Sequence, residues 1–212
     1  MRTLASSCLL LTLLLLFGCG SEPADRADAG PAPPDTADSR SPEAPPAPAP
    51  TVREQADAAL SALAEKDMAA LAELAHPDRG VRFSPYTYIE EEHVVLYPPA
   101  LQSALSSDRK YLWGAYDGTG DPIQLTFAEY YDEFIYDRDF EFADERSYDG
   151  CPQRGNTINN IADFYEDATC VEYYLDGTDA YGGMDWSSLR LLFAPHEGVP
   201  KLVGVAHSQW TI

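Results

Sequence analysis

The C-terminal stretch, residues 181–212, constrains the fold more than any other part of the chain. It reads YGGMDWSSLRLLFAPHEGVPKLVGVAHSQWTI, in which two long apolar runs are separated only by a short turn that contains a glycine. Such a pattern predicts a β-hairpin, here with arms at 186–193 and 201–211. Because both arms are apolar over most of their length, we expect this hairpin at the centre of a sheet that other elements cover.

Side chains on the second arm should alternate between the two faces of that sheet. The odd positions from Val203 to Gln209, including His207, are expected on one face, and the even positions from Leu202 to Trp210 on the other. We expect Leu202, Val203 and Val205 in the core.

The segment before the sheet predicts two helices, at 52–65 and 68–75, arranged as a bent pair. Thr51 and Glu54 form a capping box, and Asp67 is placed to cap the second helix. Pro98 and Pro99 suit the first turn of a short third helix that ends near residue 106. Further strands are expected at 81–86, 94–97, 110–116, 123–125 and 171–175, whereas 137–149 is expected to be irregular.

A fourth helix should begin after Thr126, which forms a second capping box with Glu129. Four aromatic residues follow at the spacing of one helical face: Phe127, Tyr130, Tyr131 and Phe134. Such a stripe is expected to pack in the core rather than to bind a cofactor.

The chain begins with the pattern of a secretion signal. A positive start at Arg2 precedes an apolar run at 9–17, which is too short to span a bilayer. Leu16-Phe17-Gly18-Cys19 resembles the lipobox of bacterial lipoproteins, which implies cleavage after residue 18 and acylation of Cys19 with diacylglycerol and palmitate. Gly20 follows the cysteine, which by the same resemblance implies the outer membrane in a Gram-negative host. The alternative is an ordinary signal peptide in which the cysteine occurs by chance.

Residues 19–50 predict a disordered tether between this anchor and a single domain at 51–212. Nine of the 17 prolines of the chain fall in this segment, which contains no aromatic residue, Leu, Ile or Val. Such a composition cannot bury enough apolar surface to offset the entropy of folding.

Two of the four cysteines belong to the expected domain. Cys8 lies in the signal and Cys19 at the anchor, so Cys151 and Cys170 remain, and outside the cytoplasm they are expected to form a disulfide. Metal ligation by this pair is the alternative, although a CxxC spacing is absent.

The chain is strongly acidic, with a formal net charge of −21 at pH 7. Phosphate backbones and anionic lipid surfaces attract Lys and Arg, so this charge argues against nucleic acid or a bare anionic membrane as partners. The expected partners are the membrane through the lipid anchor and either a small apolar ligand or an envelope protein.

Two stretches resemble the nuclear-transport-factor-2-like superfamily, which includes ketosteroid isomerase and the SnoaL-like cyclases. They are ALSALAEKDMAALAELAHPDRGVRFSPY at 59–86 and LRLLFAPHEGVPKLVGVAHSQWTI at 189–212. They are also similar to bacterial lipoproteins of unassigned function. The resemblance implies an α+β fold in which a curved antiparallel or mixed sheet packs on N-terminal helices as a cone. The catalytic Tyr and Asp residues of the isomerases match no motif in this sequence.

A cone of this kind implies a pocket between the helices and the sheet. The expected lining residues are Tyr86, Trp113, Tyr131, His207 and Trp210. His207 could act as a general base if a carboxylate lay beside it, but a histidine on a strand can equally be a hydrogen-bonded core residue. The acidic loops at 117–121 and 176–185 offer calcium ligands without the full EF-hand spacing.

The sequence therefore favours a lipid-anchored, non-catalytic binding or envelope-associated module. Motifs for a nucleophile elbow, a phosphate loop, a zinc protease or a dinucleotide fold are missing, so neither a catalytic residue nor a cofactor is assigned. A small-molecule enzyme of the isomerase or cyclase type is the alternative.

Overall fold

The computed structural model describes residues 48–211. The expected signal, Cys19 and nearly all of the expected tether lie outside these residues. Within the described part, we find no helix with the length and apolar character needed to cross a membrane.

The N-terminal helices are α1 (Val52–Ala64) and α2 (Met68–Leu74), in agreement with the prediction. The Glu54 carboxylate accepts from the Thr51 backbone N–H at 2.7 Å, and the Thr51 hydroxyl accepts from the Glu54 N–H, so the capping box is formed. Asp67 caps α2 by accepting from two backbone N–H groups of its first turn. The chain turns between the helices through a positive φ of 56° at Lys66.

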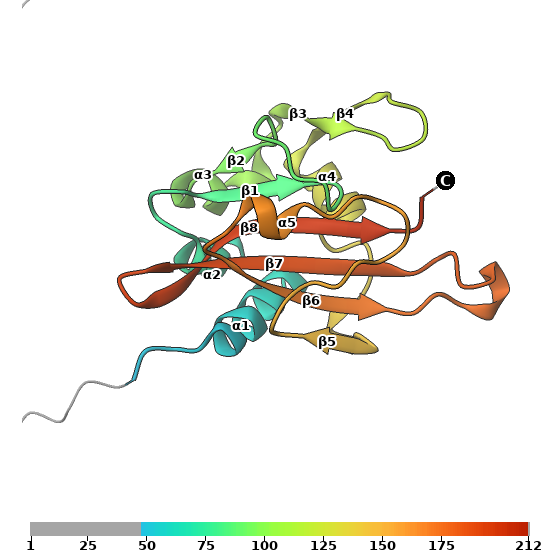
Figure 1. The fold of residues 1–212 in the computed structure, drawn as a ribbon. Coiled ribbons are helices and arrows are strands. Elements are labelled where there is room, and N and C mark those ends of the chain that lie inside the picture. Colours follow the sequence, from blue (N-terminus) through green and yellow to red (C-terminus); the bar gives the residue numbers. More distant parts are fainter. Residues whose placement is uncertain (1–47, 212) are drawn as a thin grey trace, which may run out of the picture. The chain divides into compact units, whose positions relative to one another are not determined.

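Six strands form one curved mixed sheet in the order β2-β1-β8-β7-β6-β5 (Figure 1). β1 is parallel to β8, and the other neighbours are antiparallel. The strands are β1 (Val81–Ser84), β2 (Val95–Leu96), β5 (Glu145–Ser147), β6 (Thr169–Leu175), β7 (Ser187–His196) and β8 (Val199–Gln209). The C-terminal hairpin β7–β8 is therefore central, as predicted.

The hairpin closes through a tight turn at Glu197 and Gly198, whose φ angles are 50° and 80°. Two successive positive φ values are typical of the turn that matches the right-handed twist of a two-residue hairpin. The sheet pairs His196 with Val199 on either side of this turn.

A β-bulge changes the alternation of side chains along β8. The register shifts so that Leu192 pairs with Gly204 but Phe193 pairs with Leu202, which leaves Val203 as the extra residue. Leu202 consequently packs with Val205 on the inner face, and Val203 packs on the outer face. Our assignment of faces was thus wrong for Leu202 and Val203, although all three expected core residues are buried.

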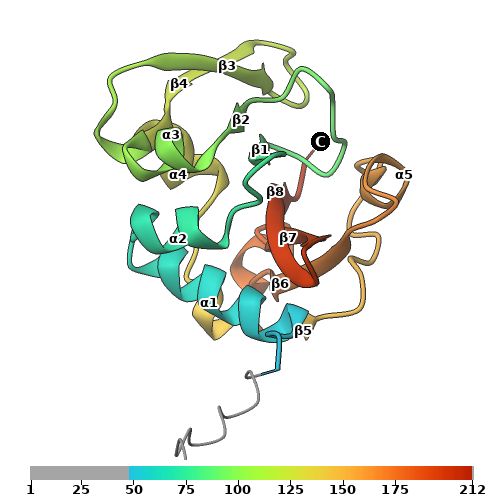
Figure 2. The same cartoon turned by 90° about the vertical axis from the view of Figure 1, so that its left-hand side faces the viewer.

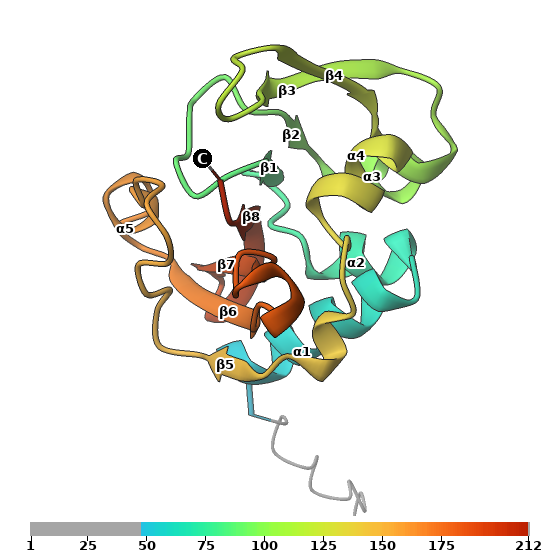
Figure 3. The ribbon, with the colours of Figure 1, turned by 90° about the vertical axis from the view of Figure 1, so that its right-hand side faces the viewer.

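The two faces of the sheet are covered by different elements (Figures 2 and 3). α1, α2 and α4 (Phe127–Phe134) cover the inner face, and α5 (Ile161–Phe164) with its flanking loops covers the outer face. The inner face holds the larger core, whose fully buried aromatic side chains include Phe83, Trp113, Phe127, Tyr130, Tyr131 and Phe134. The aromatic stripe of α4 is therefore core, as predicted.

A second sheet pairs β3 (Lys110–Ala115) with β4 (Pro122–Thr126). Before β3 lie α3 (Pro98–Gln102) and the 3₁₀ turn η1 (Ala104–Ser106), where one short helix was expected. The prediction that 137–149 is irregular was wrong, because this segment contains η2 (Phe140–Phe142) and the edge strand β5.

The α+β class and the curved mixed sheet packed on N-terminal helices are confirmed. The arrangement is consistent with a cone, and Trp113 lies fully buried among aromatic side chains in its interior.

Candidate functional site

A cleft with a volume of about 510 Å³ lies at the rim of the domain. Three segments far apart in the sequence form its walls: residues 85–93 between β1 and β2, the end of β3 with residues 116–117, and the loop at 156–158. Two smaller cavities, of about 310 Å³ and 250 Å³, lie beside the disulfide and beside Arg82.

Hydrogen bonds connect the first wall to the third. The Thr87 hydroxyl donates to the Ile158 carbonyl at 3.1 Å. The Asn160 amide accepts from the Ile89 N–H at 2.7 Å and donates to the Ile89 carbonyl at 2.9 Å. Paired bonds of this kind fix the backbone of both loops, so these two walls are held at a set separation.

The second wall is held through the phenol of Tyr86, which accepts from the Asp117 backbone N–H at 3.1 Å. The β3–β4 register shifts between Leu112 and Ala115, immediately before this wall. Gly114 has a φ of 139°, which a side chain would strain.

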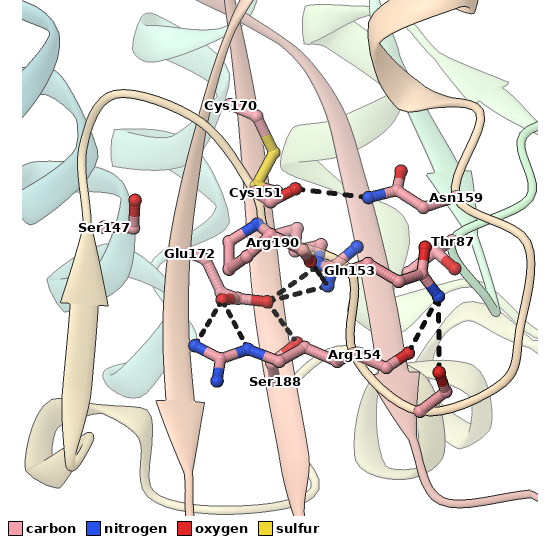
Figure 4. A network of polar contacts seen from close by, with 12 residues as sticks. Thr87, Ser147, Cys151, Gln153, Arg154, Asn159, Cys170, Glu172, Ser188 and Arg190 are labelled. Carbon is pink, nitrogen blue, oxygen red and sulfur yellow. Dashed lines mark hydrogen bonds and ion pairs between the residues drawn. A yellow bond between two sulfur atoms is a disulfide. The ribbon is translucent and has the colours of Figure 1, made fainter.

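The predicted disulfide between Cys151 and Cys170 is present and supports the third wall (Figure 4). It ties the loop to β6, and the Asn159 side chain donates to the Cys151 carbonyl at 3.2 Å. Gln153 donates to the Thr157 carbonyl at 2.7 Å. The disulfide therefore contributes to the shape of the cleft as well as to stability.

His93 is a cleft residue that was not predicted from the sequence. Its side chain is almost fully buried, and Nδ1 accepts from the Glu90 N–H at 3.2 Å. This bond places the proton on Nε2, which lies 3.4 Å from the Glu90 carboxylate. Burial, followed by the charge of Arg82, lowers the pKa of His93 to about 4, so the ring is neutral at pH 7. The acidic run EEEH at 90–93, beside an expected strand, is the only signal that could have singled it out.

Two tyrosine phenols of the cleft lie close to carboxylates. Burial raises the pKa of Tyr86. The hydrogen bond from the Asp117 backbone lowers this pKa, and the charges of Asp117 and Glu133 raise it. Tyr116 donates to the Glu133 carboxylate at 3.3 Å, and burial and this contact raise the pKa of Tyr116. Both phenols are therefore neutral at pH 7.

Tyr86 is the only one of the five expected pocket residues that lines this cleft. Trp113 and Tyr131 are fully buried in the inner core, where Trp113 stacks on Tyr130 with ring centroids 4.0 Å apart. Tyr131 donates a hydrogen bond to the Leu63 carbonyl of α1. Trp210 follows the end of β8 and is exposed.

His207 has a carboxylate and a hydroxyl beside it, but both meet the same ring nitrogen. Nε2 lies 3.1 Å from the Ser187 hydroxyl and 3.1 Å from the Asp137 carboxylate. A nucleophile, base and carboxylate triad instead needs its carboxylate on the other nitrogen. His207 is 0% exposed, and it does not line any of the three cavities named above. This geometry suits a structural contact rather than a general base.

The outer face of the sheet carries a buried ion-pair network (Figure 4). Glu172 accepts from Arg190 at 2.9 Å and from Arg154 at 3.0 Å, and Arg154 continues to the exposed Glu145. Ser188 also donates to Glu172 at 3.1 Å. The carboxylate of Glu172 is thus fully used within the protein.

Among residues 48–211, one cluster brings three potential metal ligands together: His76, Asp78 and His196. The His76 Nδ1 accepts from the backbone N–H groups of Asp78 and Arg79, each at 3.2 Å. Those bonds occupy the free lone pair of the neutral ring and place the proton on Nε2. An ion would have to displace both donors, so the geometry does not favour a metal here. The acidic loops form no such cluster, and Asp185 accepts from Thr178 within its own loop.

No protein-family model matches this chain, and no curated protein matches it. Among solved structures, the chain is similar to a designed protein whose name contains NTF2. The two are 12% identical, the match covers 74% of this chain and 95% of the other, and the TM-score is 0.33. The α+β class rests on the strand order and helices described above.

Proposed function

We propose that this chain is a membrane-anchored, secreted bacterial lipoprotein whose globular domain is a non-catalytic binding or envelope-associated module. The anchor rests on the sequence, in which a short apolar run leads to Leu16-Phe17-Gly18-Cys19. The domain is placed on the extracytoplasmic side of the envelope, on the outer membrane in a Gram-negative host.

The rim cleft is the observation that carries the binding proposal. Its volume of about 510 Å³ falls in the range of small-molecule sites. Hydrogen bonds and a disulfide hold its walls, so little conformational entropy would be lost on binding. The inner core is filled by stacked aromatic side chains instead.

A small-molecule enzyme of the isomerase or cyclase type is the second candidate, and one observation favours it. The structure brings His207 within 3.1 Å of the Asp137 carboxylate, as a general base would need. Its complete burial counts against the idea, because a substrate proton must come within hydrogen-bond reach of the ring. A turnover that His207→Gln abolishes while the fold is retained would establish this candidate and refute the non-catalytic proposal.

The anchor is tested by Cys19→Ala in the full chain. The variant should leave the membrane fraction and appear in the soluble extracytoplasmic fraction. Continued membrane association would refute lipidation at this residue.

Binding at the cleft is tested by screening small molecules against the full chain in nonionic detergent by ligand-observed NMR. Ala115→Trp should abolish the binding of cleft ligands, because Ala115 is an exposed lining residue and the larger ring would fill the space. Leu112→Trp is the matched control, since Leu112 is exposed on the same strand but outside the lining. Hits that both variants bind equally, or a screen without hits, would contradict the proposal.

A further inference from the structure

The chemistry of the cleft lining is unusual for a site of purely apolar ligands. Three tyrosines, at 86, 88 and 116, share the lining with two carboxylates, Glu90 and Asp117. Of the described residues that line the cleft, none is Lys or Arg. The lining therefore combines aromatic rings with uncompensated negative charge.

His93 does not offset this charge. With a pKa near 4 it is neutral at pH 7, and its Nε2–H faces the Glu90 carboxylate. Arg82 lies behind this wall, and its guanidinium donates to the backbone carbonyls of residues 90, 91 and 93. It also lies 3.6 Å from the Glu91 carboxylate and lines a different cavity. The Arg82 guanidinium is thus engaged by the back of the wall, and although its charge acts on His93, it does not line the cleft.

Carboxylates also lie near the phenols of two cleft tyrosines, Tyr86 and Tyr116. The Tyr116 phenol donates to Glu133, and the Tyr86 phenol accepts from the backbone of Asp117. The charges of Glu133 and Asp117 both act on Tyr86 in the direction that disfavours a further negative charge. An anionic ligand would meet the same repulsion, whereas a cation would be attracted.

We propose that the cleft binds an organic cation, with an ammonium or guanidinium group between the tyrosine rings and the carboxylates and an apolar stem along Pro85 and Ile158. The proposal rests on the proposed function, because it names the ligand class of the same site. A cation near aromatic ring faces gains from their quadrupoles, and the carboxylates at the mouth add a screened attraction. Together these effects correspond to a preference of roughly 10-fold or more over a neutral molecule of equal shape.

The test is isothermal titration of the full chain in nonionic detergent with three cations and one neutral isostere. Choline, putrescine and agmatine supply a quaternary ammonium, primary ammonium groups and a guanidinium, and 3,3-dimethylbutan-1-ol has the shape of choline without its charge. We expect at least one of the three cations to bind. If choline binds, its affinity should be roughly 10-fold higher than that of the alcohol. The double variant Glu90→Gln, Asp117→Asn should weaken cation binding several-fold, whereas Glu92→Gln, outside the lining, should leave it unchanged.

A second matched pair tests the aromatic part. Tyr88 and Tyr97 are exposed to similar extents, 47% and 51%, but only Tyr88 lines the cleft. Tyr88→Leu should weaken cation binding several-fold and Tyr97→Leu should not.

Two results would overturn the inference while leaving the binding proposal intact. The first is that the alcohol binds as tightly as choline. The second is that none of the three cations binds, although neutral molecules bind and Ala115→Trp abolishes their binding. A cleft that binds neither cations nor screened neutral molecules would refute both.

Discussion

The inner core around Trp113 and the rim cleft around Tyr86 are both built from aromatic side chains, and Phe134 contacts both. Its ring centroid lies 5.3 Å from that of Tyr130 in the core and 5.9 Å from that of Tyr86 at the cleft. The two regions differ in what surrounds the rings. Helices and the sheet enclose the core rings completely, whereas loops with carboxylates border the cleft rings.

This difference shows that aromatic content alone does not distinguish packing from binding. In the core, the Trp113 indole N–H donates to the Leu125 carbonyl at 2.9 Å, whereas the buried Tyr130 hydroxyl has no hydrogen-bond partner among the described residues. In the cleft, the phenols contact charged groups and an exposed loop, and space remains between them. The core therefore supplies stability, whereas the cleft leaves an open surface, which we propose as the binding site.

The largest expected effect is on the core side of this comparison. Trp113→Ala should lower the free energy of unfolding by about 3–5 kcal/mol, because it leaves a large cavity beneath Phe83 and Tyr130. Urea unfolding followed by circular dichroism measures the change. Trp210→Ala is the control and should cost no more than about 0.5 kcal/mol, since Trp210 is 41% exposed. Equal losses for the two variants would remove the distinction between a filled core and an open rim.

The next effect links stability to the cleft wall. Replacing Cys151 and Cys170 together by serine should cost about 3 kcal/mol, as expected for a crosslink spanning 19 positions. NMR shift changes in this double variant should reach Thr157 and Ile158 in the cleft but leave the Trp113 indole unchanged, because the disulfide holds only the outer loop. If the indole shifted as much as the loop, the core and the rim would be one unit rather than two.

The fold could be predicted largely from the sequence because its signals are local. Thr51 with Glu54 and Thr126 with Glu129 marked two helix starts, and two apolar runs around a glycine turn marked the central hairpin. The β-bulge at Val203 was not visible, because nothing in a run of apolar residues reveals an extra residue in the register. Edge strand β5 was missed for a related reason: its short, polar segment is a strand only because β6 pairs with it.

The candidate site could be predicted only in part, because it depends on contacts between distant segments. Tyr86 was expected in a pocket and lines one, but Trp113 and Tyr131 carry the same aromatic signal and lie in the core. The cleft walls come together through Asn160 and Ile89, which are 71 positions apart. His93 is buried in the folded chain, and the acidic run EEEH at 90–93 alone does not show that burial.

A smaller effect on the cleft side is a pH dependence of the free energy of unfolding. Burial lowers the pKa of His93 from 6.5 to about 4, so between these values the unfolded chain binds more protons than the folded chain. The contribution of His93 to stability is complete above pH 6.5 and is lost as the pH falls towards 4. Between pH 7.5 and pH 5 this loss should amount to about 2 kcal/mol.

His93→Asn isolates this contribution, because the Asn side-chain oxygen can still accept from the Glu90 N–H. The stability of the variant should fall less between pH 7.5 and pH 5 than that of the unmodified chain. Burial also lowers the pKa of His76, and the contribution of His76 to the pH dependence of stability is the same in both proteins. The difference between the two stability curves therefore reports His93. Parallel curves would mean that His93 is accessible to solvent protons and that the cleft wall is more open than described.

The smallest effect comes from two hydroxyl groups, one in each region. Tyr131→Phe removes a buried hydrogen bond to the Leu63 carbonyl, which retains a second bond from the Lys66 N–H at 3.0 Å. The cost should be about 1 kcal/mol, the usual net value of one such bond. Tyr86→Phe removes a bond to the exposed Asp117 N–H, which water can replace, so its cost should be about 0.3 kcal/mol. Urea unfolding of both variants compares the contributions of the two hydroxyl groups to the free energy of unfolding. A larger cost for Tyr86→Phe would mean that the hydroxyl at the rim stabilises the protein more than the one in the core. In that case the phenol of Tyr86 would be a structural support of the cleft, and the case for recognition would rest on Tyr88 and Tyr116.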